Sequence, residues 1–256
     1  MSGAGAFGPG LAHLVVAAAA CLHDGEVCFV GIGSPSLAAM YALRTHAPNL
    51  VLVYESGVVG ARPRDVPLST GSETVIRGAA MVAPMTTVFG ELQAGRVDVG
   101  LLSGAQVDGT GNVNSTRLGP REQPRTYLAG SGGAHDIGLL ARRTVILMPH
   151  DPRRFADRVD HVTTPGLVPD SAVPHPRGPA TLVTDRARFA YRDGEVVLDR
   201  LCPGVEVDAA LDGIPWPVRV DSTVEETVIP SEADLAELSQ LLLPGPAVTT
   251  SEGARS

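Results

Sequence analysis

The chain has 256 residues, of which 44% are hydrophobic and only 4% aromatic, so a well-buried core would consist mainly of Ala, Val, Leu and Ile. The formal net charge of −8 argues against a nucleic-acid-binding surface. The apolar run 11–22 is too short to span a bilayer and no basic residue precedes it, so we expect neither a signal segment nor a membrane anchor.

Cysteines and histidines give no recognisable metal or disulfide pattern. The three cysteines lack CxxC spacing, and their odd number provides no disulfide framework. Cys21 and Cys28 stand in apolar surroundings and are expected to be structural, which indicates a reducing, cytoplasmic compartment. The seven histidines are scattered, and HExxH is absent. We therefore expect no metal site, and His150 is the histidine that a zinc alternative would use.

Helices and strands are predicted to alternate through the first 150 residues. Helices are expected at 11–22, 36–46 and 86–95, with a short one near 73–79, and strands at 26–32, 49–54, 97–102 and 144–148. Ser34 or Ser36 is a plausible N-cap for the second helix. This alternation predicts an α/β fold with a mostly parallel sheet and helices on its faces.

The second half of the chain is predicted to be richer in turns. Residues 107–125 are turn-rich, 161–163 is a possible short strand, and 165–180 is a loop rich in Pro and Gly. Short strands are expected at 181–184, 189–192 and 195–198, the last two joined by an Asp193-Gly194 hairpin turn.

The end of the chain is predicted to carry one more helix and a tail. The helix spans 231–243 and is capped by Ser231, with Asp234 three residues later. No repeat and no clear linker is visible, so we expect one domain over residues 1–245 and a disordered tail at 246–256.

A glutamate directly follows the predicted strand 49–54. Glu55 would therefore lie at the carboxyl edge of the sheet, where ligands of open α/β proteins gather. A carboxylate there can act as a base, a metal ligand or a nucleophile, and Gly57 gives backbone room beside it. The alternative is an ordinary surface glutamate in a loop.

Three glycine-containing segments are further candidates for a site. Gly31-Ile-Gly33 lacks the third glycine of a dinucleotide motif, which favours a tight strand-to-helix turn. The segment 129–134 could present backbone N–H groups to an oxyanion or a phosphate, or form a plain turn. In 104–116, four polar side chains could orient a substrate or simply hold turns: Gln106, Asp108, Asn112 and Asn114.

Four motifs in order resemble one known family. They are Glu55-Ser-Gly57, Gly104–Asp108 with Gly111–Thr116, Gly130–Ala134, and Arg153–Phe155 with Asp160–Gly166. Together they resemble the β subunit of class I CoA-transferases, particularly the glutaconate CoA-transferase type, over roughly residues 10–245. The resemblance implies an open three-layer α/β/α fold with a mostly parallel sheet.

The resemblance also implies a mechanism and a set of site residues. Glu55 would be the nucleophile that forms a covalent glutamyl-CoA thioester during CoA transfer between an acyl-CoA and a free carboxylic acid. Gly132, Gly133 and Ala134 match the segment that helps build the oxyanion hole and the CoA pocket. Substrate-binding roles fall on four residues: Ser56, Gly57, Gln106 and Asn114. No metal and no tightly bound cofactor is implied, because the coenzyme A thioester is itself the substrate.

The same resemblance implies a partner and leaves alternatives open. The α-type half is absent from this sequence, so a separate α subunit is expected, in a heterodimer or an α2β2 assembly. Relatives on this scaffold also hydrolyse, decarboxylate or cleave CoA thioesters, and a non-catalytic partner subunit is a further alternative; the presence of Glu55 favours transfer. Gly71-Ser-Glu73 and the connection 165–180 depart from the glutaconate type, which leaves the acid substrate open.

Overall fold

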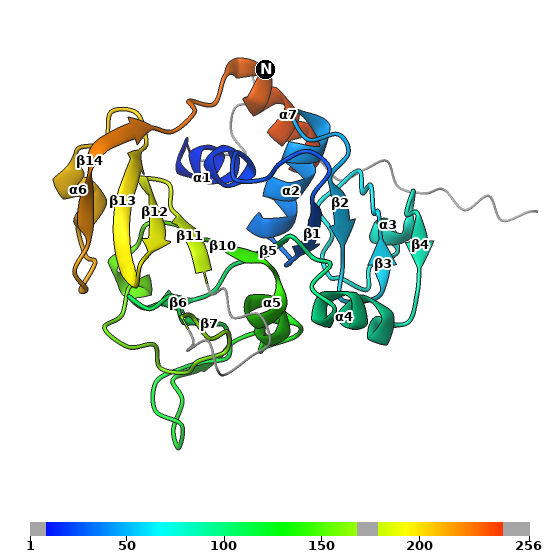
Figure 1. Ribbon diagram of the computed structural model, residues 1–256, viewed down its shortest axis with the longest axis horizontal. Helices are drawn as coiled ribbons and strands as arrows, with labels where there is room; N and C mark the ends of the chain where they lie inside the picture. The colour runs from blue at the N-terminus through cyan, green and yellow to red at the C-terminus, as the bar shows by residue number, and fades with distance from the viewer. Residues whose placement is uncertain (1–8, 168–178, 243–256) are drawn as a thin grey trace, which may run out of the picture.

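The computed structural model describes residues 9–167 and 179–242, and all structural statements concern these residues. One ten-stranded sheet runs through them, in the order β14-β13-β12-β11-β10-β5-β1-β2-β3-β4 (Figure 1). The five central strands are mutually parallel: β2 (Val51–Val53), β1 (Val27–Val30), β5 (Val99–Leu102), β10 (Arg143–Leu147) and β11 (Pro179–Val183). The mostly parallel sheet expected from the sequence is confirmed.

Different strands extend this parallel centre on its two sides. Beyond β2 come two short antiparallel strands, β3 (Val58–Val59) and β4 (Met81–Val82). Beyond β11 come the antiparallel hairpin of β12 (Ala187–Arg192) and β13 (Glu195–Leu201), and then β14 (Arg219–Glu226), which is parallel to β13. Asp193 and Gly194 both have positive φ, 53° and 80°, which confirms the predicted hairpin turn.

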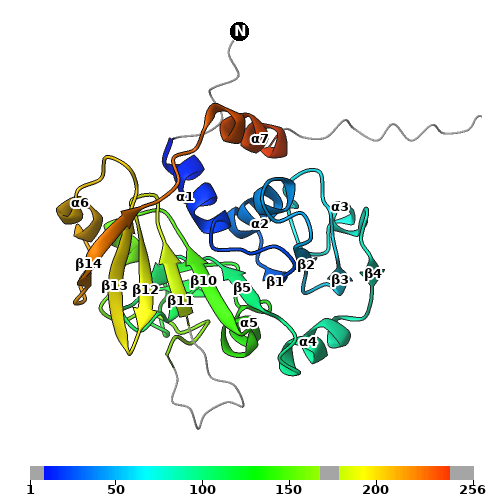
Figure 2. The same ribbon diagram turned by 45° about the horizontal axis from the view of Figure 1, so that its top comes forward.

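Helices cover both faces of the sheet. Cys28 and Val30 of β1 belong to a core with α1 (Pro9–Ala19), α2 (Ser34–Arg44) and α7 (Glu232–Leu242), whereas Phe29 between them belongs to a core with α4 (Met85–Gln93) and α5 (Ala134–Leu140). Successive strand residues point to opposite faces, so one apolar strand can serve both cores. Figures 1 and 2 show the two groups of helices on opposite faces, which confirms the three-layer α/β/α architecture.

Small residues let these helices lie close to the sheet. A Cβ at Gly100 of β5 would stand only 2.4 Å from Cγ2 of Ile137 in α5. Ala12 and the run Ala17–Ala19 bury the inner side of α1. The low aromatic content of the sequence is thus compensated by close backbone approach.

A third core lies under the other end of the sheet. It joins β11, β12 and β13 to the small hairpin of β6 (Gln106–Val107) and β7 (Val113–Asn114), to Phe155, which follows the 3₁₀ turn η1 (Pro152–Arg154), and to α6 (Val207–Leu211). A second hairpin follows, made of β8 (Arg117–Leu118) and β9 (Thr126–Tyr127). The region predicted only as turn-rich, 107–125, therefore takes part in two short hairpins.

Several local predictions are corrected. Neither Ser34 nor Ser36 caps α2: the N-cap is Gly33, and the Ser36 hydroxyl donates to the Gly31 carbonyl at 2.9 Å. The strand predicted at 161–163 is wrong, since only Thr164 forms an isolated bridge, with Val113. The helix α5 and the strand β14 were not predicted.

Other predictions are confirmed or remain untested. The capping box is confirmed, because the Ser231 N–H donates to Oδ2 of Asp234 and the Asp234 N–H donates to the Ser231 hydroxyl. Residues 168–178 of the predicted loop and the whole predicted tail 246–256 lie outside the described residues, so the single domain over 1–245 stays a prediction. No helix in the described ranges has the length and apolar character needed to cross a membrane.

Candidate active site

Glu55 stands in the tight turn that follows the central strand β2. The Tyr54 N–H donates to the Val58 carbonyl and the Gly57 N–H donates to the Tyr54 carbonyl, so the chain reverses within a few residues. Gly57 has φ of 102°, and a Cβ there would lie 1.8 Å from the Ala83 carbonyl oxygen, so only glycine fits. The turn holds the half-buried Glu55 side chain at the carboxyl edge of the sheet, as the sequence predicted.

Two neutral donors hold the Glu55 carboxylate, one on each oxygen. The backbone N–H of Gly133 donates to Oε2 at 2.6 Å, and the hydroxyl of Thr70 donates to Oε1 at 3.2 Å. None of the ion pairs formed within the described ranges includes Glu55. A carboxylate oriented by neutral donors keeps more of its nucleophilic electron density than one neutralised by a guanidinium.

The predicted glycine-rich segment lies directly against this carboxylate. A Cβ at Gly132, which has φ of 46°, would stand 3.0 Å from Oε2 of Glu55. A Cβ at Gly133 would stand 3.0 Å from the same oxygen and 2.8 Å from the ring of Phe89. The two glycines therefore allow the backbone to approach the carboxylate. The N–H of Ala134 is already used, because it donates to the Ser131 carbonyl in the turn that begins α5.

A cavity of about 500 Å³ opens beside Glu55. Its lining comes from three parts of the chain: Glu55, then Met85, Thr86 and Phe89 of α4, then Gly132, Gly133 and Asp136. Phe89 also packs against Phe29 of β1, with ring centroids 5.6 Å apart. The volume suits the reacting end of a thioester better than a whole coenzyme A molecule.

Sequence reasoning missed Thr70 and the α4 residues of this site. Nothing in the sequence around Thr70 separates it from other loop threonines, because its role depends on a contact with Glu55, fifteen positions earlier. For α4 a signal was present. The predicted helix 86–95 follows the Glu55 turn along the chain, and Phe89 is one of only five phenylalanines.

The hydroxyl groups of the two residues next to the glutamate, Tyr54 and Ser56, are both buried and have no hydrogen-bond partner among the described residues. Buried polar groups usually have a partner, so these two are unusual. Burial also raises the pKa of Tyr54 to about 12. The substrate-binding roles of Ser56 and Gly57 stay predictions.

Gln106 and Asn114 are not brought to the Glu55 cavity. They face each other across the β6–β7 hairpin, where the Asn114 amide donates to the Gln106 side-chain oxygen at 2.7 Å. Asn114 also donates to the Arg117 carbonyl, and Gln106 donates to Asp160 at 3.2 Å. Their polar atoms are thus used in holding the hairpin and the chain beside it, and substrate binding by these two residues stays a prediction without a place in the cavity.

Asp108 and Asn112 likewise hold a turn. One oxygen of Asp108 accepts from the N–H groups of Thr110 and Asn112, and the other accepts from the Asn112 amide. The Asn112 side-chain oxygen accepts from the Gly166 N–H at 2.8 Å. These contacts are those of an Asx turn, the second of the two roles that the sequence allowed.

His150 is a buried structural histidine. Its Nε2 lies 2.9 Å from the Asp212 carbonyl oxygen, its ring meets Phe155 edge-on at 4.8 Å, and burial lowers its pKa. In the part of the chain that the structure describes, no group of three or more His, Cys, Asp or Glu side chains is arranged to hold a metal ion. The cysteines Cys21, Cys28 and Cys202 are all unbridged and buried.

Sequence comparisons identify relatives along most of the chain. Residues 12–209 match the family model of Coenzyme A transferase. The chain is 38% identical over 237 residues to the B-type subunit of 3-oxoadipate CoA-transferase from Pseudomonas knackmussii, covering 89% of this chain and 91% of the relative. It is 31% identical over 218 residues to the B-type subunit of glutaconate CoA-transferase from Acidaminococcus fermentans, covering 80% and 81%.

Solved structures of similar fold agree with the sequence comparisons. Glutaconate CoA-transferase from Acidaminococcus fermentans superposes with a TM-score of 0.84 at 28% identity, covering 94% of this chain and 97% of that one. The decarboxylase AibA/AibB superposes with a TM-score of 0.77 at 25% identity, covering 91% and 94%. The resemblance seen in the motifs is confirmed, although the glutaconate type is only one of several similar relatives. The chain belongs to the Coenzyme A transferase family, whose substrates are CoA thioesters, and is the β subunit of a heteromeric CoA-transferase that works with a separate α subunit.

Proposed function

We propose that Glu55 is the nucleophile of this CoA-transferase and that the reaction passes through a covalent glutamyl-CoA thioester. The observation that carries the proposal is the carboxylate itself, which faces a cavity of about 500 Å³ and is oriented on both oxygens by neutral donors. The structural carboxylate of Asp108 accepts from the N–H groups of its own turn, whereas the two donors to Glu55 come from distant segments that meet at the cavity.

The chemistry has two halves that mirror each other. The Glu55 carboxylate attacks the thioester carbonyl of the acyl-CoA, CoA thiolate leaves, and an acyl-glutamyl anhydride remains. The thiolate then attacks the glutamyl carbonyl and expels the first carboxylic acid as its carboxylate, which leaves a glutamyl-CoA thioester. The acceptor carboxylate reverses these two steps and leaves as the new acyl-CoA, so Glu55 is regenerated.

Gly133 supports the steps in which the glutamyl carbonyl is attacked. Its N–H already points at Oε2 of Glu55 from 2.6 Å. When thiolate attacks the anhydride, negative charge develops on the oxygen that stays bound to the glutamyl carbon, and a fixed backbone donor stabilises that charge without reorganising. This role of Gly133 is narrower than the predicted trio with Gly132 and Ala134, because the Ala134 N–H is held by Ser131.

The substrate class follows from the relatives and from the lining of the cavity. The two relatives described above are named for 3-oxoadipate and glutaconate, which are both dicarboxylic acids. We infer a small dicarboxylic acid or its CoA thioester as one substrate. Among the described residues, the cavity lining contains the carboxylates of Glu55 and Asp136 but no Lys or Arg, so a cation for the second carboxylate would come from the α subunit. We also propose that the enzyme has no tightly bound cofactor, because the coenzyme A thioester is its substrate. We further propose that it acts in the cytoplasm, since its three cysteines are buried and unbridged.

The test uses the enzyme purified with its α subunit and incubated with candidate acyl-CoAs without acceptor acid. Intact-protein mass should show a covalent CoA adduct on this chain, mapped to the Glu55 peptide and absent in Glu55→Gln. Glu195→Gln, which changes an exposed carboxylate on β13, is the matched control and should keep the adduct. Turnover without an adduct, with free acid or carbon dioxide released, would instead assign a hydrolase or a decarboxylase such as its structural neighbour.

A further inference from the structure

A second, smaller cavity lies at the other end of the sheet from Glu55, where the end of α1 meets β12, β13 and the segment after β14. Its volume is about 150 Å³. Six residues line it: Ala17, Ala20, Arg188, Arg200, Thr227 and Val228. The cavity beside Glu55 shares none of these residues, so the two cavities have separate linings.

The charged groups in this lining are all cations. Among the described residues that line the cavity, two are arginines, one is a threonine and none is an Asp or Glu. A guanidinium group can only donate hydrogen bonds, and its planar set of N–H groups matches the oxygens of a carboxylate or a phosphate. The chemistry of the lining therefore favours an anionic ligand over a cation or an apolar molecule.

Two polar atoms of the lining are buried without a partner. They are Nε of Arg200 and the hydroxyl oxygen of Thr227, neither of which has a hydrogen-bond partner among the described residues. Thr227 is only 8% exposed. Beside it lies the thiol of Cys202, whose pKa is raised by burial, and a neutral thiol is a weak acceptor. Buried donors that lack a partner are costly, so an acceptor in the cavity would stabilise both.

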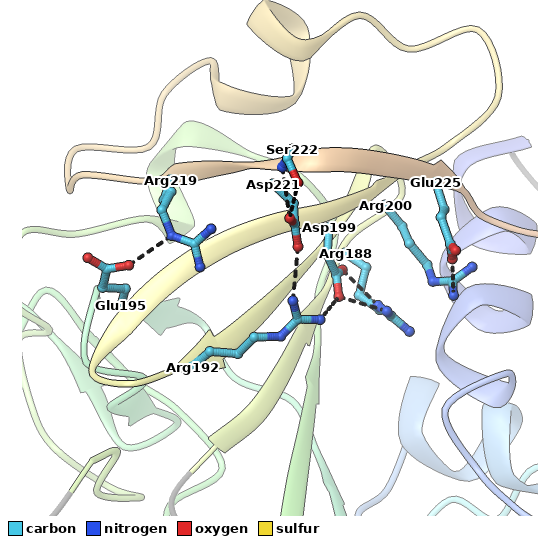
Figure 3. A network of polar contacts seen from close by, with 9 residues as sticks. All are labelled: Arg188, Arg192, Glu195, Asp199, Arg200, Arg219, Asp221, Ser222 and Glu225. Atoms are coloured by element: carbon cyan, nitrogen blue, oxygen red, sulfur yellow. Dashed lines mark hydrogen bonds and ion pairs between the residues drawn. The ribbon is translucent and has the colours of Figure 1, made fainter.

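The two arginines face each other across neighbouring strands. Arg188 of β12 is the register partner of Arg200 of β13, and Figure 3 shows both side chains extending toward the same side of the sheet. Like charges in this arrangement repel each other. Arg188 donates from Nε and Nη2 to Asp199, and Nη2 of Arg200 pairs with Glu225. Neither carboxylate lines the cavity, so an anion inside it would reduce the repulsion from a side that these carboxylates do not occupy.

We propose that this cavity binds one small oxyanion of the size of inorganic phosphate, held by Arg188, Arg200 and Thr227. The volume corresponds to about five water molecules, which suits a phosphate ion or a short carboxylate but not a CoA thioester. The bound anion would connect β12 and β13 to the segment that follows β14, and so stabilise this edge of the sheet. The site takes no part in the reaction at Glu55.

The experiment uses the enzyme assembled with its α subunit. Hydrogen exchange is followed in peptides that cover β13, β14 and Thr227, with increasing inorganic phosphate and with sodium chloride at matched ionic strength. Phosphate should slow exchange in these peptides about threefold or more and saturate, because a ligand that binds only the folded segment suppresses its opening. Chloride should not. Acetate is titrated in the same way, and protection by acetate alone would keep the oxyanion site but assign it to a carboxylate.

Three variants test the residues of the site. Thr227→Val, which keeps the shape of the side chain, and Arg200→Gln should each abolish the protection by phosphate. Arg219→Gln is the matched control, because it removes the same charge from β14 at an ion pair with Glu195 that lies outside the cavity, and it should keep the protection. Circular dichroism and the unfolding midpoint check the fold. If Arg200→Gln does not fold, Thr227→Val still decides.

Three outcomes would overturn the proposal. Exchange that phosphate and acetate do not slow, or that chloride slows equally, would leave the cavity to water alone. Protection that persists in both Thr227→Val and Arg200→Gln would place the phosphate elsewhere. Phosphate should also leave kcat/KM for the acyl-CoA unchanged. Competition with the acyl-CoA that persists in Thr227→Val, without protection of β13 and β14, would assign phosphate to the catalytic cavity.

Discussion

The two ends of the sheet solve the problem of exposed edges in opposite ways. At the β14 end, a nearly buried Asp199 is shared by Arg188 and Arg192, and Arg192 continues to Asp221 (Figure 3). At the β4 end, apolar side chains face solvent and the Ser56 hydroxyl is buried without a partner among the described residues. At the first end the charged side chains pair within this chain, while the Arg200 Nε and the Tyr191 hydroxyl are buried without a partner among the described residues. At the second end the exposed side chains are apolar.

The difference shows where the molecule accepts energetic cost for function. Ion pairs on β12–β14 match the charged side chains of this region with one another. Around Glu55, by contrast, strands of two residues and an exposed apolar edge add little stability to an isolated chain. These features gather where a nucleophile must be reachable by substrate and then closed from water.

The largest effect is expected from Gly57→Ala. A Cβ at this position would lie 1.8 Å from the Ala83 carbonyl oxygen, and φ is 102°, so the Glu55 turn and the chain leading to α4 must both move. We expect a loss of more than about 3 kcal/mol in the free energy of unfolding, and a loss of activity at temperatures where the chain remains folded. Urea denaturation measures the change in the free energy of unfolding, and steady-state kinetics measures the loss of activity.

Gly194→Ala at the other end of the sheet is the control for backbone strain alone. Its φ is 80°, but a Cβ there meets nothing within 4 Å. We expect a loss of about 1 kcal/mol with unchanged kcat. Equal losses in the free energy of unfolding of the two variants would show that the chain around Gly57 can move to accommodate a Cβ. The contrast between the two ends of the sheet would then be weaker.

The fold was largely predictable because the parallel strands correspond to short apolar runs in the sequence. The predicted strands at 26–32, 49–54 and 97–102 contain observed strands of the sheet, and the predicted strand at 144–148 overlaps β10 (Arg143–Leu147). Strands of two residues, such as β3 and β4, carry no periodic signal, and their pairing depends on contacts between distant parts of the chain. β14 escaped prediction because its mostly exposed sequence, RVDSTVEE (Arg219–Glu226), has no regular alternation of apolar and polar residues.

The site was predictable only in part, for a related reason. Glu55 and the glycines that touch it were candidates because a carboxylate follows a buried strand and a run of glycines can present backbone donors, and the resemblance of the motifs to CoA-transferases singled them out. Thr70 could not, because a hydroxyl in a loop is common and its contact with Glu55 exists only in the fold. Gln106 and Asn114 looked like ligand-binding residues because amides that hold a hairpin together have the same sequence signature.

The next largest effect is expected from Asp199→Ala, at the β14 end. The change leaves Arg188 and Arg192 without their shared carboxylate, to which Arg188 donates at 2.9 and 2.7 Å. Breaking a buried pair is costly, but the two arginine side chains are 25% and 47% exposed, so we expect about 2 kcal/mol of destabilisation. Activity of the assembled enzyme should be unchanged.

Glu195→Ala on the same hairpin calibrates that result. Its ion pair with Arg219 is about half exposed on both sides, and its removal should change the free energy of unfolding by less than about 0.5 kcal/mol. A drop in kcat in Asp199→Ala would mean that the β14 end is coupled to the catalytic end, contrary to the comparison.

Thr70→Val is expected to leave the free energy of unfolding nearly unchanged, and it bears most directly on the catalytic end. Valine keeps the shape of threonine but removes the hydroxyl that donates to Oε1 of Glu55 at 3.2 Å. Glu55 would keep its bond from Gly133 but gain freedom to rotate. We expect kcat to fall about tenfold, equivalent to about 1.4 kcal/mol, with little change in KM or in the free energy of unfolding. Thr70→Ser, which restores the donor, should recover most of the rate. If instead KM rises while kcat stays constant, Thr70 contacts the substrate rather than positioning the nucleophile. The Thr70 hydroxyl would then be a substrate-binding group that donates to Glu55 when no substrate is bound.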